Sequence, residues 1–287
     1  MIQFAKRNLK VFFRDRSSVF FSLLAVMIVL GLYVLFLGDQ LIGSVKDELK
    51  GADKLMDSWI MAGILAVTPV STTLGSFGAI VNDKSKKIYK DFRCSPIKTH
   101  SIAGGYIISS FCVGTIMSVF ALLLVEIYFA AKGYGLLSAT QWLQMLATIL
   151  VSVLVSSALM YLVVSLFSSQ NAFATASTIV GTLIGFITGI YLPIGSTDQS
   201  VQYFIEFFPI SHAASVFRKI LMAEPLTESF KGIPDSFKNE FMIDMGIEYK
   251  INDHTFTTLE SFVYMILAAI IFYIIAIIIT GRKNNNG

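Results

Sequence analysis

Long apolar stretches alternate with short polar ones along most of this chain. A helix needs about 20 apolar residues to cross the roughly 30 Å hydrocarbon core of a bilayer. Six stretches meet that requirement, and only the third carries a charge, at Glu126. The pattern predicts an all-α polytopic membrane protein of about six transmembrane helices, at residues 19–37, 59–81, 102–131, 142–167, 172–192 and 261–280.

The fourth and fifth spans share one uncharged run. Between Lys132 and Asp198 there are 65 residues without a charge, and the run must hold two helices. Residues 168–171, Ser-Ser-Gln-Asn, are its most polar cluster. Polar clusters of this kind interrupt helices, so the break between the two spans is predicted there.

Residues 1–17 form a distinct amphipathic segment before the first span. On a helix, its apolar residues share one arc and its basic residues the neighbouring arc. A basic amphipathic helix of this kind lies in the membrane interface, although an ordinary membrane-anchoring flank has the same composition. The apolar arc comprises Ile2, Ala5, Leu9, Phe12 and Phe13, and the polar arc Gln3, Lys6, Arg7, Lys10 and Arg14.

Residues 193–260 form the longest polar region. It contains an apolar segment, residues 210–222, whose 13 residues make about 20 Å of helix and are too few to span. A re-entrant or outer helix before the last span is therefore predicted. Residues 224–253 are mixed polar and acidic with two prolines, and they are expected to form an exposed lobe.

The composition excludes an ordinary soluble domain. The chain is 55% hydrophobic and 14% charged, against about 25% charged in typical soluble domains. Its two cysteines, Cys94 and Cys112, fall in a basic loop and an apolar run, so no disulfide between them is expected. Abundant Ile, Lys, Phe and Asn suggest a bacterial source.

The basic residues predict an orientation. With the N-terminus in the cytoplasm, the inner segments hold thirteen basic and three acidic residues. Because short loops rich in Lys and Arg stay inside, both termini are expected to be cytoplasmic, with residues 82–100 in an inner loop and 193–260 outside. The predicted location is the cell membrane.

The motifs of several enzyme and carrier classes are missing. The sequence has no phosphate-binding P-loop, no H-E-x-x-H and no G-x-S-x-G. Glu126 is the one acid inside a span, and such an acid either lines a pathway or pairs locally near the interface. Ion-coupled carriers show several intramembrane charges, so the energy source is expected outside this chain.

The basic loop 82–100 is where such a source would attach. It is interrupted by the apolar residues Ile88, Phe92 and Ile97. The loop can lie on anionic lipid headgroups. It can equally dock a cytoplasmic protein, with Ile88, Tyr89 and Phe92 as anchors and the charges as a rim.

The order of these features resembles the permease subunit of type 2 ATP-binding cassette (ABC) exporters over essentially the whole chain. After span two the family pattern runs acid, basic, small, apolar and then Ser/Thr-Pro, although here Asp83 replaces the usual Glu and a Gly-Thr pair is missing. After span five come Pro-containing apolar segments, Leu192-Pro193-Ile194 and Phe208-Pro209-Ile210, and then Arg218. The span-two pattern is carried by Asp83, Lys84, Ser85, Ile88, Phe92, Arg93, Ser95 and Pro96.

The resemblance implies that residues 84–95 contain a coupling helix that docks into a separate ATPase subunit. Two ATPase copies would bind the ATP and Mg, this chain would bind no cofactor or metal and would not itself be an enzyme, and a second permease chain, identical or paralogous, would complete the pathway. ATPase-coupling residues are then Asp83, Lys84, Ile88, Tyr89, Phe92, Arg93, Ser95 and Pro96.

Spans one, two and five would line the pathway by the same resemblance. Small polar residues there suit either close helix packing or a mildly polar lining. The candidate pathway residues are Glu126, Ser71, Thr72, Thr175 and Thr182. A largely apolar lining favours export of hydrophobic drugs, antimicrobial peptides or lipids, as in multidrug efflux. The alternatives are an ion-coupled secondary transporter or channel, and a non-transport immunity or sensor subunit.

Overall fold

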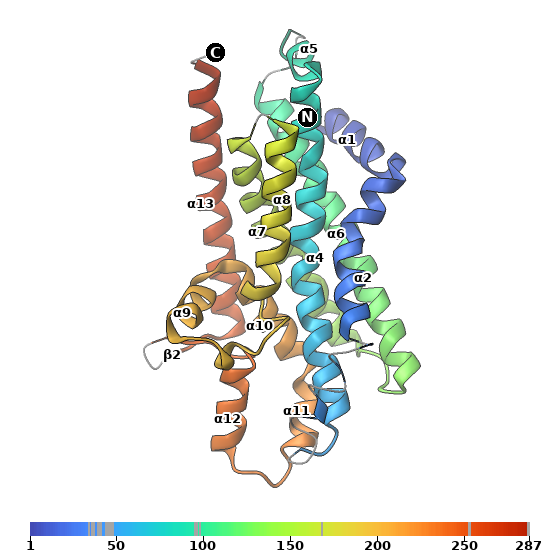
Figure 1. The fold of residues 1–287 in the computed structure, drawn as a ribbon, viewed down its shortest axis with the longest axis vertical. Helices are drawn as coiled ribbons and strands as arrows, with labels where there is room; N and C mark the ends of the chain where they lie inside the picture. The colour runs from blue at the N-terminus through green and yellow to red at the C-terminus, as the bar shows by residue number, and fades with distance from the viewer. Residues whose placement is uncertain are drawn as a thin grey trace.

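Five long apolar helices run along the longest axis of the computed structural model (Figure 1). Each is long and apolar enough to cross a membrane, which agrees with the all-helical membrane fold that the sequence predicts. The structure describes residues 1–33, 35, 38, 42–43, 49–94, 97, 99–167, 169–251 and 254–285. The five helices are α4 (Ala52–Ser85), α6 (Thr99–Lys132), α7 (Ala139–Leu166), α8 (Gln170–Ile187) and α13 (Thr258–Asn285).

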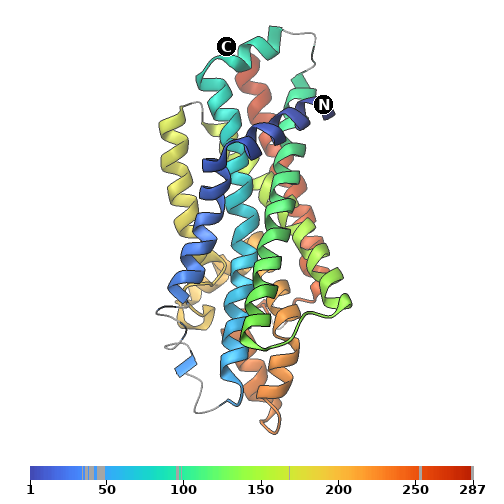
Figure 2. The same cartoon turned by 90° about the vertical axis from the view of Figure 1, so that its right-hand side faces the viewer.

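Two further helices begin the chain. α1 (Ile2–Arg14) packs mainly against α6, and α2 (Arg16–Leu32) turns away from it to run beside α4 (Figure 2). α2 has 17 residues. The predicted first span, residues 19–37, continues past its end into positions 34, 36 and 37, which lie outside the described residues. The sixth crossing therefore stays a prediction.

α4 is the central helix of the bundle. It packs against α2, α6, α7, α8 and α10, and 78% of its most apolar window is buried, against 11% for α8. Pro69 stands in the middle of α4 and cannot donate a backbone hydrogen bond. One turn later, the hydroxyls of Thr72 and Thr73 donate to the Pro69 carbonyl at 3.3 and 2.7 Å.

α7 and α8 meet at the polar cluster. α7 ends at Leu166 and α8 begins at Gln170, so the helix breaks where the sequence indicates. α8 ends at Ile187, five residues before the predicted end of the fifth span. The physical reason is Gly189, which adopts a φ of +64°, a conformation that favours glycine and ends the helix.

A compact group of short helices fills the chain between α8 and α13. α10 lies inside the bundle against α4, α7 and α13, and every one of its residues except Lys219 is buried. The lobe beyond it holds α11, α12 and one antiparallel hairpin, β1 paired with β2. The bounds are η2 (Ile194–Ser196), α9 (Gln199–Phe207), α10 (Pro209–Leu221), α11 (Ala223–Ser229), α12 (Asp235–Asp244), β1 (Lys250–Ile251) and β2 (His254–Thr255).

The two ends of the bundle differ. One end, which we call the α5 end, carries both termini and α5 (Ile88–Cys94), and the other, the α12 end, carries α11 and α12 (Figures 1 and 2). Cys94 and Cys112 are free thiols, as expected.

Candidate functional site

α5 is a short helix that follows α4 at one end of the bundle. The backbone turns at Lys87, whose φ of +63° is rare for a residue with a side chain. α5 carries Ile88, Tyr89, Phe92 and Arg93 of the predicted coupling segment. Ile88 and Phe92 are half-buried, whereas Ser95 and Pro96 and the side chains of Tyr89 and Arg93 lie outside the described part of the chain.

Phe92 joins α5 to the N-terminal helix. Its ring meets the ring of Phe4 edge to face, with centroids 5.0 Å apart. The guanidinium of Arg7 lies 5.1 Å from the Phe92 ring centre, within the range of a cation–π contact. α5 is therefore packed against α1 rather than standing free.

Asp83 ties three helices together at the same end. Arg7 Nη1 on α1 donates to Asp83 Oδ2 at 2.7 Å, and the Tyr106 hydroxyl on α6 donates to the same oxygen at 2.6 Å. Asp83 is only 4% exposed. Of the neighbouring basic residues, Lys84 is half-buried and Lys86 and Lys87 are exposed. The surface of this end is thus basic, while the predicted docking acid faces inward.

This buried cluster was not predictable from the coupling pattern. Sequence reasoning placed Asp83 in the docking loop and Arg7 on a membrane-facing helix. The two are 76 residues apart. A basic residue on the inner face of the first helix and an acid at the end of the second span were the only signals, and neither indicates pairing by itself.

The candidate pathway residues do not form one cluster. On α4, Thr72 is fully buried and Ser71 is half-buried, and on α8 Thr175 and Thr182 are exposed. Their hydroxyls donate to carbonyls of their own helices, at 3.0 Å for Ser71 to Val67. The exposed α8 threonines share a face with Thr178.

α2 and α8 both approach α4 at glycines. A Cβ on Gly75 would lie 2.7 Å from Ser22 Oγ of α2, and a Cβ on Gly78 would lie 3.4 Å from Phe173 of α8. The three helices therefore form one side of the bundle. Toward the α5 end, a cavity of about 400 Å³ opens between them and α1, with polar lining from Arg7, Asp15, Asn82, Lys86 and Gln170.

Glu126 lies near the α12 end of α6 and is 7% exposed. Its Oε1 accepts a hydrogen bond of 3.0 Å from the backbone N–H of Leu137. The carboxylate thus binds the turn between α6 and α7, the local arrangement that was one of the two alternatives. A role for Glu126 in transport stays a prediction.

Asp57 forms a second buried cluster at the α12 end of α4. The Tyr33 hydroxyl donates to it at 2.6 Å and the Tyr134 hydroxyl at 2.7 Å, with Lys132 Nζ at 3.9 Å. Burial, together with the hydrogen bond to Asp57, raises the pKa of Tyr134. This carboxylate therefore holds the end of α2 and the α6–α7 turn against α4.

Arg218 is a third buried charge. It is 0% exposed, and its Nη2 donates to the carbonyls of Thr188 and Gly189, each at 2.9 Å. Its guanidinium lies 4.8 Å from the Trp59 ring centre. Burial lowers the pKa of Arg218 to about 10. Arg218 fixes the end of α8 to α10 and α4.

His212 lies earlier on the same helix, α10. Its Nε2 is 2.8 Å from the Glu206 carbonyl, which can only accept, so Nε2 carries the proton. The rings of Tyr249, Phe256 and Tyr264 surround it at 4.6 to 5.3 Å. Burial lowers its pKa to about 4, so the ring is neutral at pH 7.

The arrangement defines a class: a multi-pass membrane protein whose helices form a bundle with a small helix packed on one end. Residues 42–278 match the family model described as ABC-2 family transporter protein, and the chain belongs to that family. It is the membrane component of an ABC-2 type transporter. Such components lack catalytic ATPase activity and generally pair with an ABC ATPase. No curated protein matches the chain.

Proposed function

We propose that this chain is half of an ATP-driven exporter. α5 docks into a cytoplasmic P-loop ATPase, present in two copies, which binds the ATP and Mg. A second permease chain, identical or paralogous, completes the pathway. The α5 end is cytoplasmic, and the substrate moves out across the cell membrane, here of a bacterium.

The observation that carries the proposal is the connection of α5 to the bundle. Phe92 contacts α1 through Phe4 and Arg7, and Arg7 in turn binds Asp83 at the end of α4. A displacement of α5 is therefore transmitted to α1, α4 and α6 as a rigid-body movement. The exposed charges of Lys86 and Lys87 suit an acidic rim on the ATPase.

α8 supports a pathway between two chains. α8 and α13 are both peripheral, with 11% and 17% of their most apolar windows buried. After Thr258, the exposed described residues of α13 are Leu, Val and Ile, whereas those of α8 include Thr175, Thr178 and Thr182. The α13 face suits lipid tails, and the α8 face suits a partner chain or a pathway.

The proposed substrate is hydrophobic or amphipathic, such as a drug, an antimicrobial peptide or a lipid. On α8, the threonines alternate with exposed apolar side chains, among them Ile179, Leu183 and Phe186. Their hydroxyls are already bonded within the helix, and the described residues of this face carry no charge between Gln170 and Ile187. Such a lining offers little to a free sugar or an ion.

The test reverses the two exposed charges next to α5. Lys86→Glu with Lys87→Glu is expected to reduce ATPase recovered with the affinity-purified chain at least fivefold and to abolish ATP-dependent export of a hydrophobic dye from cells. Membrane insertion should not change, because neither side chain is buried.

Lys231→Glu is the matched control, since Lys231 is exposed at the α12 end. It should leave ATPase recovery unchanged. Export driven by an ion gradient in vesicles that lack ATP would overturn the proposal in favour of a secondary transporter. Ligand binding without any vectorial flux would instead indicate a sensor or immunity subunit.

A further inference from the structure

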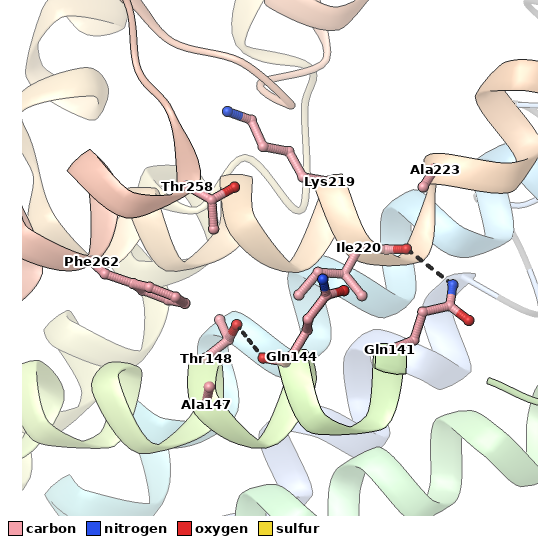
Figure 3. A pocket seen from close by; sticks show the side chains of 9 residues that line it. All are labelled: Gln141, Gln144, Ala147, Thr148, Lys219, Ile220, Ala223, Thr258 and Phe262. Carbon is pink, nitrogen blue, oxygen red and sulfur yellow. Dashed lines mark hydrogen bonds between the residues drawn. The ribbon is translucent and has the colours of Figure 1, made fainter. Parts of the chain in front are cut away.

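A cavity of about 350 Å³ lies between α7, α10 and α13 (Figure 3). Ligand sites occupy roughly 300 to 1,000 Å³. Polar groups converge on it from three helices: Gln141, Gln144 and Thr148 of α7, Lys219 of α10 and Thr258 of α13. Phe262 and Ile220 supply its apolar wall.

The cavity lies at the α12 end of α7 and α13, where these helices are expected to enter the headgroup region. α7 has 28 residues and is about 42 Å long, which exceeds the roughly 30 Å hydrocarbon core. Gln141 is the third residue of α7 and Thr258 is the first of α13. Trp142, half-buried beside Gln141, is of the type that gathers at membrane–water boundaries.

The cavity opens beside surfaces that suit acyl chains. Around α7, the pocket-lining face adjoins a face with three exposed leucines, of which Leu143 is 70% exposed. Around α13, Thr258 and Phe262 adjoin Leu259, which is 73% exposed, and Ile266. A molecule whose polar part enters the cavity would thus leave its apolar part against these helices.

The polar groups that line the cavity are mainly hydrogen-bond donors that can form further hydrogen bonds. Lys219 Nζ donates to the Phe256 carbonyl at 2.6 Å, which leaves two of its three protons. The Gln144 side chain points from α7 toward α10 (Figure 3), and no hydrogen bond of its amide is recorded among the described residues. Gln141, by contrast, is occupied by Ser138 and the Ile220 carbonyl.

The charge around the cavity is balanced rather than strongly positive. Lys219 is the one cation among the lining residues. Burial lowers the pKa of Lys219, and the nearby carboxylates of Glu248 and Glu260 act against this by favouring its charged form. One cation with neutral amide and hydroxyl donors matches a phosphate diester, which carries a single negative charge.

We propose that this cavity binds the phosphate headgroup of a membrane phospholipid, with Lys219 and Gln144 as donors to the phosphate and the acyl chains lying along α7 and α13. The site is separate from the α2–α4–α8 side, so it does not depend on the proposed transport pathway.

The experiment uses the full chain in detergent and native mass spectrometry. Phosphatidylglycerol is compared with a diacylglycerol of the same acyl chains, which lacks the phosphate. The chain is expected to bind phosphatidylglycerol at least tenfold more tightly. Equal binding of the two lipids would overturn the proposal, because the phosphate would then contribute nothing.

Two variants locate the site. Ala147→Phe fills the cavity, and Gln144→Leu removes a donor without breaking a recorded hydrogen bond within the chain. Each is expected to reduce the preference for phosphatidylglycerol at least threefold. Lys231→Gln on the lobe is the control, and it should leave the preference unchanged.

Unaltered binding by both cavity variants would overturn the proposal. So would binding of inorganic phosphate at this cavity without binding of the lipid, which would indicate a site for a free anion. The melting temperature of each variant, measured in the same detergent, separates loss of the site from loss of the fold.

Discussion

Arg218 brings a positive charge into a site built from backbone carbonyls. Its recorded partners in the described chain are the carbonyls of Thr188, Gly189 and Gly246 and the ring of Trp59. Buried acceptors that lose their donor cost about 1 to 3 kcal/mol each. The planar guanidinium is the side chain that can reach several carbonyls at once.

Arg218→Met is therefore expected to lower the free energy of unfolding by about 3 kcal/mol or more, since it leaves the carbonyls of Thr188 and Gly189 without donors. Arg218→Lys keeps the positive charge but lacks the planar guanidinium. Its free energy of unfolding should therefore lie between those of the unmodified chain and Arg218→Met. Thermal unfolding in detergent measures the loss. The exposed Lys231→Met is the control, and a native melting temperature for Arg218→Met would contradict the prediction.

Contacts between individual side chains on different helices are what the sequence predicts least well. The pattern after span two identified Asp83 and Phe92 as notable, but their partners Arg7 and Phe4 lie 76 and 88 residues earlier in the chain. Nothing in the sequence pattern around Asp57 indicates that two tyrosine hydroxyls hold it. Such contacts depend on how helices pack, and composition or spacing along one helix does not contain that information.

At the scale of elements, the apolar stretches predicted most helices because membrane thickness fixes their length. The break before Gln170 was predictable from local polarity alone. The early end of α8 before Gly189 and the burial of α10 were not predicted, although Arg218 joins the two elements by donating to the carbonyls of Thr188 and Gly189. Long-range contacts thus override the local apolar pattern there.

Helix spacing gives an element-scale prediction at Gly114 of α6. A Cβ there would lie 2.8 Å from Val153 of α7 and 2.9 Å from Thr73 of α4. Gly114→Ala is expected to force the three helices apart and to cost about 1 to 3 kcal/mol, as overpacking does. The unfolding temperature in detergent measures the cost.

Gly181 of α8 provides the matched control. No atom lies within 4 Å of a Cβ built at Gly181, and the residue is helical. Gly181→Ala should be neutral or stabilise by up to about 1 kcal/mol through its better helix propensity. If Gly114→Ala proved as stable as Gly181→Ala, close packing of α6 on α4 and α7 would not be a source of stability.

Of the two peripheral helices of the described chain, α8 exposes threonines among apolar side chains and α13 exposes mainly aliphatic ones, and the difference predicts how two copies meet. A single cysteine, Thr178→Cys on α8, in a chain whose Cys94 and Cys112 are replaced by serine, should form a disulfide-linked dimer in membranes under mild oxidation. Thr178 is exposed on the face proposed for the partner chain. Gel electrophoresis without reductant measures the dimer.

Ile271→Cys on α13 is the control, because Ile271 is 54% exposed on the lipid-suited face. It should remain monomeric under the same oxidation. Dimers through Ile271→Cys and none through Thr178→Cys would place the partner on the wrong side of the bundle for a pathway lined by α8. A paralogous partner would appear as no homodimer for either variant, and co-expression with that partner would then be required to form one.

The two buried acids of α4 have a mechanical consequence. Asp57 and Asp83 stand 26 residues apart, or about 39 Å along the helix, and each fastens α4 to two neighbours. Pro69 lies near the midpoint, where the ladder of backbone hydrogen bonds is interrupted. α4 is thus held at both ends by neighbouring elements, and the point at which it bends most easily lies near its middle. If α4 tilted by about 5° at one of these two residues, the other would move by about 3 Å, unless the helix bent at Pro69 instead.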